Sequence, residues 1–311
     1  MKKFTAYLQS KDLAPVTISY YTNNVRLFLA WIKKEAIQVS KADILKYLEH
    51  LQSHKQQQNI TRRNSLIALD HYFTFLLKAG AIKSNPTALL KIRGAKKRTL
   101  HKTYTPEGLT QLYDSYYLLF VQSFNDSHIP QNQRRQALLS RQRNAAMLSL
   151  LIHQGVKTAE LNTILVQDID LIKATIKIRG GKKGNDRTLP LNAAQTGILM
   201  QYTEKIRPQF FDYCKATDKL FFALPASGKA NTTSENLMHT FKPLTKQVKT
   251  MDKNFINCQQ LRASVITGWL KKEGLRKAQY LAGHKSINST EQYLPHDIEA
   301  LIEDVAKYNP F

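Results

Sequence analysis

Three side chains near the C-terminal end of the sequence have types and spacings that could serve chemistry on a phosphate. Arg262 lies in the segment QQLRASVITGWL, His284 follows Gly283 directly, and Tyr293 comes nine residues after that histidine. A guanidinium held in place by a packed helix suits binding of phosphate oxygens, and imidazole and phenol groups both exchange protons. These residues are therefore the first candidates for a functional site.

Two apolar segments predict the helices that would hold the arginine and the histidine. Just after Arg262, apolar residues recur at spacings of three and four, which is typical of a helix packed on one face; they are Val265, Ile266, Trp269 and Leu270. A shorter apolar run over residues 278–282 stops at Gly283, where a helix would end, and His284 follows at once. Both side chains are thus expected at the ends of packed helices.

The tyrosine is expected on a third helix. Asn288 precedes Glu291 by three residues, the spacing of a capping box, which predicts a helix that begins at Asn288 and carries Tyr293 in its first turns. Arg262, His284 and Tyr293 would then all lie at or near the ends of elements. Side chains from separate segments can converge at such places.

The segment from Gln259 to Tyr293 resembles the C-terminal signature of the tyrosine recombinases, also called lambda-type integrases. That family has H-x-x-R, then G-H some twenty residues later, and then a tyrosine nine residues past that histidine. Arg262, the pair Gly283 and His284, and Tyr293 match this pattern in order and spacing. The first histidine of the pattern is replaced by Gln259.

Two segments upstream extend the resemblance over nearly the whole chain. The family has G-[LV]-R-x-x-E after an apolar helix, and residues 155–160 read GVKTAE, with Lys157 at the arginine position. It next has a β-hairpin of the form V-x-G-K-G-x-K-x-R-x-V-P-L, and residues 178–191 read IRGGKKGNDRTLPL. This match places Lys182 at the family's catalytic lysine, with Lys183 as a second candidate.

The alternation of residues around this polar turn predicts two short strands independently of the resemblance. The lysine and glycine cluster in the turn also invites comparison with a phosphate-binding loop of nucleotide-binding proteins. It lacks the order G-x-x-x-x-G-K-[ST], so nucleotide binding is rejected.

The resemblance implies a site-specific DNA recombinase or integrase that uses no metal, nucleotide or other cofactor. Tyr293 would attack a DNA phosphodiester and form a 3′-phosphotyrosyl intermediate. Arg262, His284 and Lys157 would hold the non-bridging oxygens, and Lys182 would protonate the leaving hydroxyl.

Two of the six active-site positions depart from the family, so alternatives stay open. Lys157 keeps the charge of arginine without its planar fork, and Gln259 can donate a hydrogen bond but carries no charge. Because loss of one such donor costs on the order of 10²–10³ in rate, a catalytically impaired subunit that binds DNA and assembles with active partners is the rival to an active recombinase of atypical site. A relaxing topoisomerase with the same tyrosine chemistry is a third, less favoured reading.

The charge balance points to a polyanion as partner. Lys plus Arg number 46 and Asp plus Glu number 23 among 311 residues, a formal net charge of +23 that is spread over the whole chain. Nucleic acid, here double-stranded DNA, is the simplest such partner. Two cysteines, Cys214 and Cys258, provide neither a disulfide framework nor a cysteine-rich zinc site.

The location follows from what the sequence lacks. The N-terminal residues do not have the apolar segment of a signal peptide, and no run approaches the ~18 apolar residues of a membrane span. A cytoplasmic protein is expected, and the resemblance implies a bacterial or mobile-element origin.

The expected fold is mainly α with a small β-sheet (α+β), arranged as two domains that close around DNA as a C-shaped clamp. Residues 1–90 are predicted to form a helical, SAM-like core-binding domain with helices beginning near Phe4, after Pro15, at Ser40 and after the run HKQQQN. Arg62 and Arg63 open the last of these helices and are predicted to contact DNA together with Lys183.

A basic linker, residues 91–104, is predicted to lead into a catalytic domain, residues 105–311, whose first helix starts at Thr105-Pro106. Residues 123–136 are polar and predict a loop, to which no function is assigned. Residues 298–308 predict an amphipathic tail helix. By resemblance it would dock on a neighbouring protomer in a tetrameric synapse on DNA, where accessory recombination proteins are further candidate partners.

Overall fold

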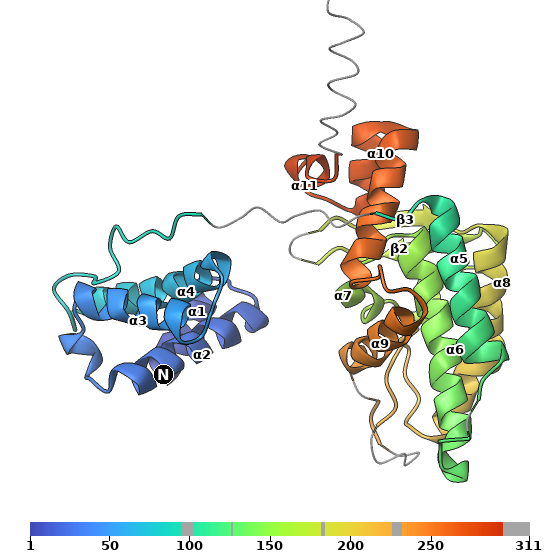
Figure 1. The fold of residues 1–311 in the computed structure, drawn as a ribbon, viewed down its shortest axis with the longest axis horizontal. Helices are drawn as coiled ribbons and strands as arrows, with labels where there is room; N and C mark the ends of the chain where they lie inside the picture. Colours follow the sequence, from blue (N-terminus) through green and yellow to red (C-terminus); the bar gives the residue numbers. More distant parts are fainter. Residues whose placement is uncertain (95–102, 126, 182–183, 226–231, 235, 295–311) are drawn as a thin grey trace, which may run out of the picture. The chain divides into compact units, whose positions relative to one another are not determined.

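The structure is a computed structural model that describes residues 1–94, 103–125, 127–181, 184–225, 232–234 and 236–294. It consists of two units, Met1–Thr99 and Leu100–Phe311 (Figure 1). Both are built mainly of helices, and the described sheet belongs to the second unit, so the predicted mainly helical class with a small sheet is confirmed. The division falls inside the predicted linker 91–104, of which residues 95–102 lie outside the described part.

Local signals set the helices of the first unit, and each of the four predicted helices is present. They are α1 (Lys2–Ser10), α2 (Pro15–Ile32), α3 (Lys41–Ser53) and α4 (Asn59–Lys78), with a short turn η1 (Ala36–Gln38). At the start of α3 the Ser40 side chain accepts a hydrogen bond from the Asp43 backbone N–H, and the Asp43 carboxylate accepts one from the Ser40 N–H. This reciprocal cap satisfies donors that the first helical turn leaves free.

Helix α6 forms the centre of the second unit. Every residue from Arg143 to Ile152 is buried, so this part of the helix is covered on all sides. Helices α5, α8 and α10 pack around it. The elements of the second unit are α5 (Pro106–Tyr117), η2 (Leu118–Gln122), α6 (Gln131–His153), α7 (Thr158–Leu161), η3 (Val166–Asp168), α8 (Ala193–Gln201), η4 (Tyr202–Ile206), η5 (Arg207–Asp212), η6 (Leu237–Thr240), α9 (Phe241–Met251), α10 (Cys258–Ala282) and α11 (Asn288–Glu291).

The sheet has three antiparallel strands in the order β1-β2-β3, namely β1 (Ile169–Asp170), β2 (Thr175–Ile178) and β3 (Arg187–Pro190). Strands β2 and β3 are the predicted hairpin, whereas β1 was not predicted. Ile176 lies opposite Leu189, and both are buried, while Lys177 and Thr188 of the adjacent pair are exposed. The alternation observed in the sequence therefore corresponds to one face toward the core and one toward solvent.

The loop predicted over residues 123–136 is wrong in its second half. Helix α6 begins at Gln131, directly after Pro130, so residues 131–136 are helical. These residues are mainly glutamine and arginine, which have high helix propensity. The first turns of α6 project into solvent, so they contain no repeating apolar residues from which a helix could be recognised. Polarity alone was therefore a poor guide to loop structure here.

One expectation for the C-terminal helices is confirmed and another is wrong. The runs around residues 265–270 and 278–282 lie in two helical segments of α10 that meet at a kink, where Gly274 has non-helical dihedrals (φ 78°, ψ 171°), and the second segment ends at Gly283 as predicted. The predicted start of the element is wrong. It starts earlier than predicted, because the Asn257 side chain accepts hydrogen bonds from the backbone of residues 259 and 260. Arg262 consequently lies within the helix and not before it.

Helix α11 contains only four residues and ends before the tyrosine. Asn288 does not cap it, because the preceding Ile287 already has helical dihedrals (φ −61°, ψ −37°) and occupies the cap position itself. Tyr293 lies two residues beyond Glu291 and therefore outside the helix in which it was predicted.

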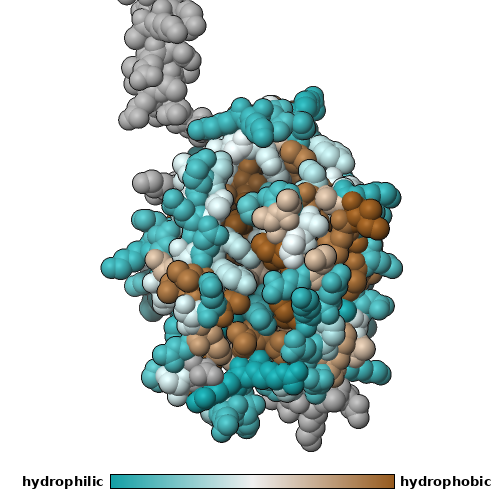
Figure 2. Space-filling view, turned by 90° about the vertical axis from the view of Figure 1, so that its right-hand side faces the viewer, coloured by the Kyte–Doolittle hydropathy of each residue, from teal (hydrophilic) through white to brown (hydrophobic). Residues whose placement is uncertain are grey.

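On the face drawn in Figure 2, apolar surface is interleaved with hydrophilic side chains. Large apolar residues that reach the surface of the second unit include Leu118, Leu119, Met200 and Tyr280. None of the helices within the described ranges is both long and apolar enough to cross a membrane.

Candidate active site

Arg262 connects three segments of the second unit. Its side chain is buried within α10, where Nη1 donates to the backbone oxygen of Gly155 and Nη2 donates to that of Ala282 at 2.7 Å. Nη2 also lies 3.1 Å from Nε2 of His284. Burial lowers the pKa of Arg262, and the nearby Glu160 and Tyr293 counter that shift. A guanidinium stays charged near neutral pH, so a fixed cation occupies the centre of this group.

Two glycines permit these close approaches. Gly155 has φ +51°, and a Cβ there would lie 3.1 Å from Cγ1 of Val265. Gly283 ends α10 in the left-handed conformation (φ +63°), and a Cβ there would lie 2.6 Å from Nη1 of Arg187. Each position thus combines a positive φ with a lack of space, and both requirements favour glycine.

A buried ion pair between Arg187 and Glu160, which the sequence analysis did not predict, lies next to the site. Arg187 on β3 donates from Nη1 and Nη2 to the two carboxylate oxygens of Glu160 at 3.1 and 2.8 Å. Burial would raise the pKa of Glu160, but the hydrogen bonds and charge of Arg187 bring it below its usual value. Both residues belong to motifs quoted above. Arg187 lies two residues before Leu189 on the same strand, so both side chains lie on the buried face of β3, and a buried arginine needs a partner of opposite charge.

Lys157 lies beside this pair with its side chain half-buried. Its Nζ is 3.7 Å from Oε1 of Glu160, and its backbone N–H donates to Oε2 of the same carboxylate at 2.8 Å. Burial lowers the pKa of Lys157; Arg262 and Arg187 lower it further, while Glu160 raises it. The ammonium group is thus held on the same carboxylate as Arg187.

Gln259 lies in the first turn of α10, one turn before Arg262, so both project from similar sides of the helix. Its backbone N–H donates to Oδ1 of Asn257 at 2.9 Å, and its side chain is exposed. Within the described residues its amide group has no hydrogen-bond partner. This amide is therefore free to donate to a bound ligand.

His284 is buried against the arginine and the tyrosine. Its Nδ1 lies 2.9 Å from Oγ1 of Thr290, and its ring stacks on that of Tyr293 with 5.9 Å between centroids and 16° between planes. Burial lowers its pKa to about 4, with further lowering by Arg262, Lys157 and Arg187. The imidazole is therefore neutral at pH 7.

Tyr293 is half-buried in the turn after α11. Thr267 of α10 donates through its hydroxyl to the backbone oxygen of Tyr293 at 3.4 Å, which holds the turn against the long helix. The predicted residues Arg262, His284, Lys157 and Tyr293 are thus brought together from three separate segments.

Lys182 and Lys183 lie outside the described residues, but the strand segment that follows them lies at the site. Gly184 forms a β-bridge with His284, and the N–H of Asn185 donates to the backbone oxygen of Gly283 at 3.1 Å. A Cβ at position 184 would be 3.6 Å from Nζ of Lys157. The described end of the hairpin loop is thereby fixed next to the imidazole.

Arg62 and Arg63 belong to the first unit and differ in their surroundings. Arg62 donates to Oε1 of Gln52 at 2.6 Å and to Oδ1 of Asn59 at 2.8 Å, so it links α3 to the start of α4. Arg63 is exposed. Contact of either residue with DNA stays a prediction.

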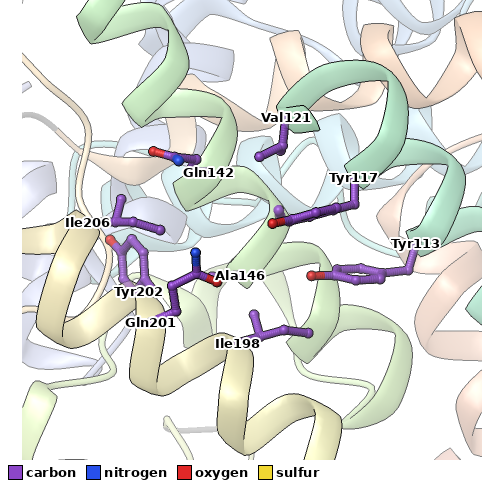
Figure 3. Close-up of a pocket in the computed structure, with 10 residues that line it drawn as sticks. Tyr113, Tyr117, Val121, Gln142, Ala146, Ile198, Gln201, Tyr202 and Ile206 are labelled. Atoms are coloured by element: carbon purple, nitrogen blue, oxygen red, sulfur yellow. The ribbon is translucent and has the colours of Figure 1, made fainter. Parts of the chain in front are cut away.

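The second unit also contains a small pocket between α5, α6 and α8 (Figure 3). It holds about 20 Å³, room for a single water molecule. Its lining includes Tyr113, whose buried hydroxyl has no hydrogen-bond partner in the described structure, but none of the residues around Arg262. Among the described residues, no group of three or more His, Cys, Asp or Glu side chains could hold a metal ion.

Comparisons with known proteins identify the family of this chain. Residues 131–299 match the phage integrase family, and residues 1–80 match the phage integrase N-terminal SAM-like domain. The chain therefore belongs to the phage integrase family.

Individual relatives match this chain over most of their length. Tyrosine recombinase XerC of Anoxybacillus flavithermus (strain DSM 21510 / WK1) is 29% identical over 299 residues, which cover 93% of this chain and 90% of that protein. XerC of Bacillus subtilis (strain 168) is 24% identical over 316 residues, covering 100% and 96%.

Solved structures show the same fold. The XerH site-specific recombinase bound to a palindromic difH substrate matches with a TM-score of 0.66 at 17% identity, over 96% of this chain and 82% of that one. A lambda integrase (75–356) dimer bound to a COC′ core site matches with a TM-score of 0.63 at 15% identity, over 94% and 93%.

The low pKa of His284 predicts a loss of stability in acid. An unfolded chain protonates histidine near pH 6.5, whereas the folded protein does so near 4. Between these values the unfolded state binds more protons, so the free energy of unfolding falls as the pH drops from about 6.5 to about 4, by at most about 3 kcal/mol from this group. Stability is fully retained above that window.

Urea unfolding at pH 7, 6, 5 and 4.5 would measure this effect. Trp269 fluorescence in a Trp31→Phe background reports on the second unit, since the chain has two tryptophans. The His284→Gln variant should lose less stability per pH unit than its parent, whereas replacement of the exposed His239 by Gln should not change the slope. Equal slopes for the parent and His284→Gln would contradict the expectation.

Proposed function

We propose that this protein is a site-specific DNA recombinase of the tyrosine type, which cuts and rejoins DNA strands through a 3′-phosphotyrosyl intermediate. The observation that carries this proposal is the convergence of Arg262, His284 and Tyr293, joined by 3.1 Å between guanidinium and imidazole and by the stacked rings. The proposed nucleophile Tyr293, the fixed cation Arg262 and the neutral imidazole of His284 thus lie next to one another. Membership of the phage integrase family supports the same chemistry.

In the proposed reaction the Tyr293 oxygen attacks phosphorus while the phenol proton passes to solvent, and the bond from phosphorus to the 5′-oxygen breaks. Arg262, His284 and Lys157 bind the non-bridging oxygens, and Gln259 adds a neutral donor from the exposed side of α10. Lys182 supplies the proton that the 5′-oxygen takes as it leaves. Attack by the 5′-hydroxyl of a partner strand reverses these steps, restores the tyrosine and joins the exchanged strands.

The proposed partner is double-stranded DNA, bound by several protomers at once. The net charge of +23 supports binding of a polyanion. One lambda integrase structure is a tetramer bound to a Holliday junction, which supports a tetrameric synapse for this chain. The tail 298–308, which lies outside the described residues, is the proposed docking segment between protomers. Closure of the two units around a duplex stays a prediction. The participation of accessory recombination proteins also stays a prediction.

Trapping of the covalent intermediate would test the proposed function. Nicked duplexes derived from the ends of the protein's own genetic element let the cleaved strand fragment diffuse away, so the adduct accumulates. A denaturant-resistant protein–DNA band on denaturing electrophoresis is the expected result. Salt-sensitive binding without any such band would instead favour the impaired DNA-binding subunit.

The double variant Lys157→Arg with Gln259→His is expected to form the adduct faster, by roughly tenfold or more. Arginine adds a planar fork for two phosphate oxygens, and histidine adds a group able to carry charge. Single-turnover rates on the nicked duplex measure the gain, with Lys173→Arg as an exposed control. A double variant slower than the wild type would show that the site depends on its lysine and glutamine.

A further inference from the structure

The loop that follows α10 carries His284, and one residue of the helix bonds this histidine twice. Gly283 ends α10 in the left-handed conformation, and the N–H of His284 donates to the backbone oxygen of Gln279 at 3.1 Å. The side chain of the same glutamine turns toward the loop, where its Nε2 donates to the backbone oxygen of His284, also at 3.1 Å. Gln279 therefore bonds both the N–H and the C=O of the histidine.

The first of these bonds is common in helices, whereas the second depends on the type of side chain. A left-handed glycine after a helix brings the N–H of the next residue to a carbonyl five residues earlier, whatever that earlier residue is. The carbonyl of the histidine needs a separate donor, and the glutamine amide supplies it. The same Nε2 lies 3.5 Å from the backbone oxygen of Lys285. The amide thus reaches the carbonyl groups of the two residues that follow Gly283.

The hairpin and α11 hold other parts of the same loop. The N–H of Asn185 donates to the backbone oxygen of Gly283, which precedes the histidine, and Oγ1 of Thr290 lies 2.9 Å from Nδ1 of the ring. The glutamine amide acts on the carbonyl that follows the ring. Without this amide the peptide after His284 can turn, which changes the direction in which the imidazole leaves the backbone.

The direction of the imidazole matters because of what lies beside it. Nε2 of His284 is 3.1 Å from Nη2 of Arg262, and this nitrogen also donates to the backbone oxygen of Ala282 at the end of α10. A hydrogen bond to a phosphate oxygen weakens steeply with distance and angle, and a displacement of about 1 Å can cost on the order of 10²-fold in rate. By tying the loop to the end of α10, Gln279 keeps the histidine and the arginine in one frame.

We propose that Gln279 is a positioning residue for cleavage, whose amide holds the backbone of His284 so that the imidazole lies beside Arg262 at the phosphate. This inference rests on the proposed function and concerns the same site. Gln279 itself touches neither the phosphate nor the tyrosine in the proposed reaction. Its effect on the rate passes through the histidine.

Two substitutions separate the donor from the shape of the side chain, since lysine and methionine are both unbranched and close to glutamine in length. Gln279→Met removes the donor, and single-turnover cleavage of the nicked duplex at saturating protein should fall about 10- to 100-fold. Gln279→Lys keeps N–H groups that can bond carbonyls at a helix end and should stay within about fivefold of the wild type. DNA affinity should be unchanged in Gln279→Met. Gln133→Met, on the exposed start of α6, is the control and should cleave like the wild type.

A double-variant cycle tests whether the glutamine acts through the histidine. If Gln279 places the imidazole, its removal has nothing further to disturb once the imidazole is gone. The double variant Gln279→Met with His284→Gln should therefore cleave within about twofold of His284→Gln alone. A general loss of stability would instead reduce the rate by the same factor in both backgrounds.

Amide hydrogen exchange measures the position of the loop without any reaction. In Gln279→Met the amides of His284 and Asn185 should exchange at least about tenfold faster, because the loop that both of them bond opens more often. Slowly exchanging amides around Arg262 should be unchanged. This measurement uses the free protein, so it remains informative if the wild type forms no adduct and the proposed function fails.

Three results would overturn the inference. Unchanged exchange at both amides in Gln279→Met would show that the amide group does not hold the loop. Wild-type cleavage by the same variant would show that the reaction does not need it, and equal factors in the two backgrounds of the cycle would mean that Gln279 does not act through His284. Gln279→Asn, which withdraws the amide by one methylene, gives the same three readings if the methionine variant does not fold.

Discussion

Replacement of Tyr293 by phenylalanine is expected to abolish the denaturant-resistant adduct, lowering its rate of formation by at least about 10⁴-fold, because the phenol oxygen is the atom that bonds to phosphorus. The phenyl ring can still stack on His284 as the phenol does, at 5.9 Å between centroids. Folding and salt-sensitive DNA binding should therefore be retained. Denaturing electrophoresis after incubation with the nicked duplex measures the adduct, and a mobility shift measures binding.

A matched control is available on the neighbouring helix. Tyr280 is exposed on α10, so Tyr280→Phe removes a hydroxyl of the same kind away from the buried group. This variant should form the adduct at the wild-type rate. Persistence of the adduct in Tyr293→Phe would mean that another residue is the nucleophile.

The second large effect is expected for Arg262→Lys. Lysine preserves the charge, so the comparison isolates the fork of the guanidinium, which binds Gly155 and Ala282 through separate nitrogens in this structure. Cleavage should fall on the order of 10³-fold, since a phosphate ligand and the position of His284 are lost together. The free energy of unfolding should also fall by about 1–3 kcal/mol, because a buried carbonyl loses its donor.

Single-turnover cleavage and urea unfolding test the two parts of this prediction separately. Arg276→Lys on the exposed side of the same helix is the control and should leave unfolding unchanged. A cleavage rate for Arg262→Lys within tenfold of the wild type would remove the guanidinium from the proposed mechanism. A large loss of cleavage with little loss of stability would assign its role to the phosphate alone.

Elements defined by neighbouring residues could be predicted from the sequence. Ser40 and Asp43 form their cap within one turn, and the β2–β3 hairpin follows an alternating pattern that local chemistry is sufficient to determine. The start of α6 could not be predicted from the sequence, because its solvent-facing first turns are as polar as a loop. The kink of α10 lies at Gly274, whose φ is positive, and a single glycine within a helical pattern does not show from the sequence that the helix bends there.

The candidate site divides in the same way. Spacing and resemblance identified Arg262, His284 and Tyr293, since each stands at a fixed distance along the chain from the others. The partnership of Glu160 with Arg187 joins residues 27 positions apart, so it depends on the register of a strand against a helix. Arg62 was predicted to contact DNA. Its hydrogen bond to Gln52 of α3 forms because α3 and α4 pack together, which the sequence does not show.

The close approach of Arg187 to Gly283 has a consequence for how these positions can vary. The guanidinium occupies the space that any Cβ at position 283 would require, 2.6 Å from its Nη1. A shorter residue at 187 would open that space but take from the buried carboxylate of Glu160 its two guanidinium hydrogen bonds, leaving the ammonium of Lys157 at 3.7 Å as its neighbouring cation. Neither position has an acceptable single change, so the two form an epistatic pair: a library randomised at both should return arginine and glycine together, or substitutes that appear only in combination.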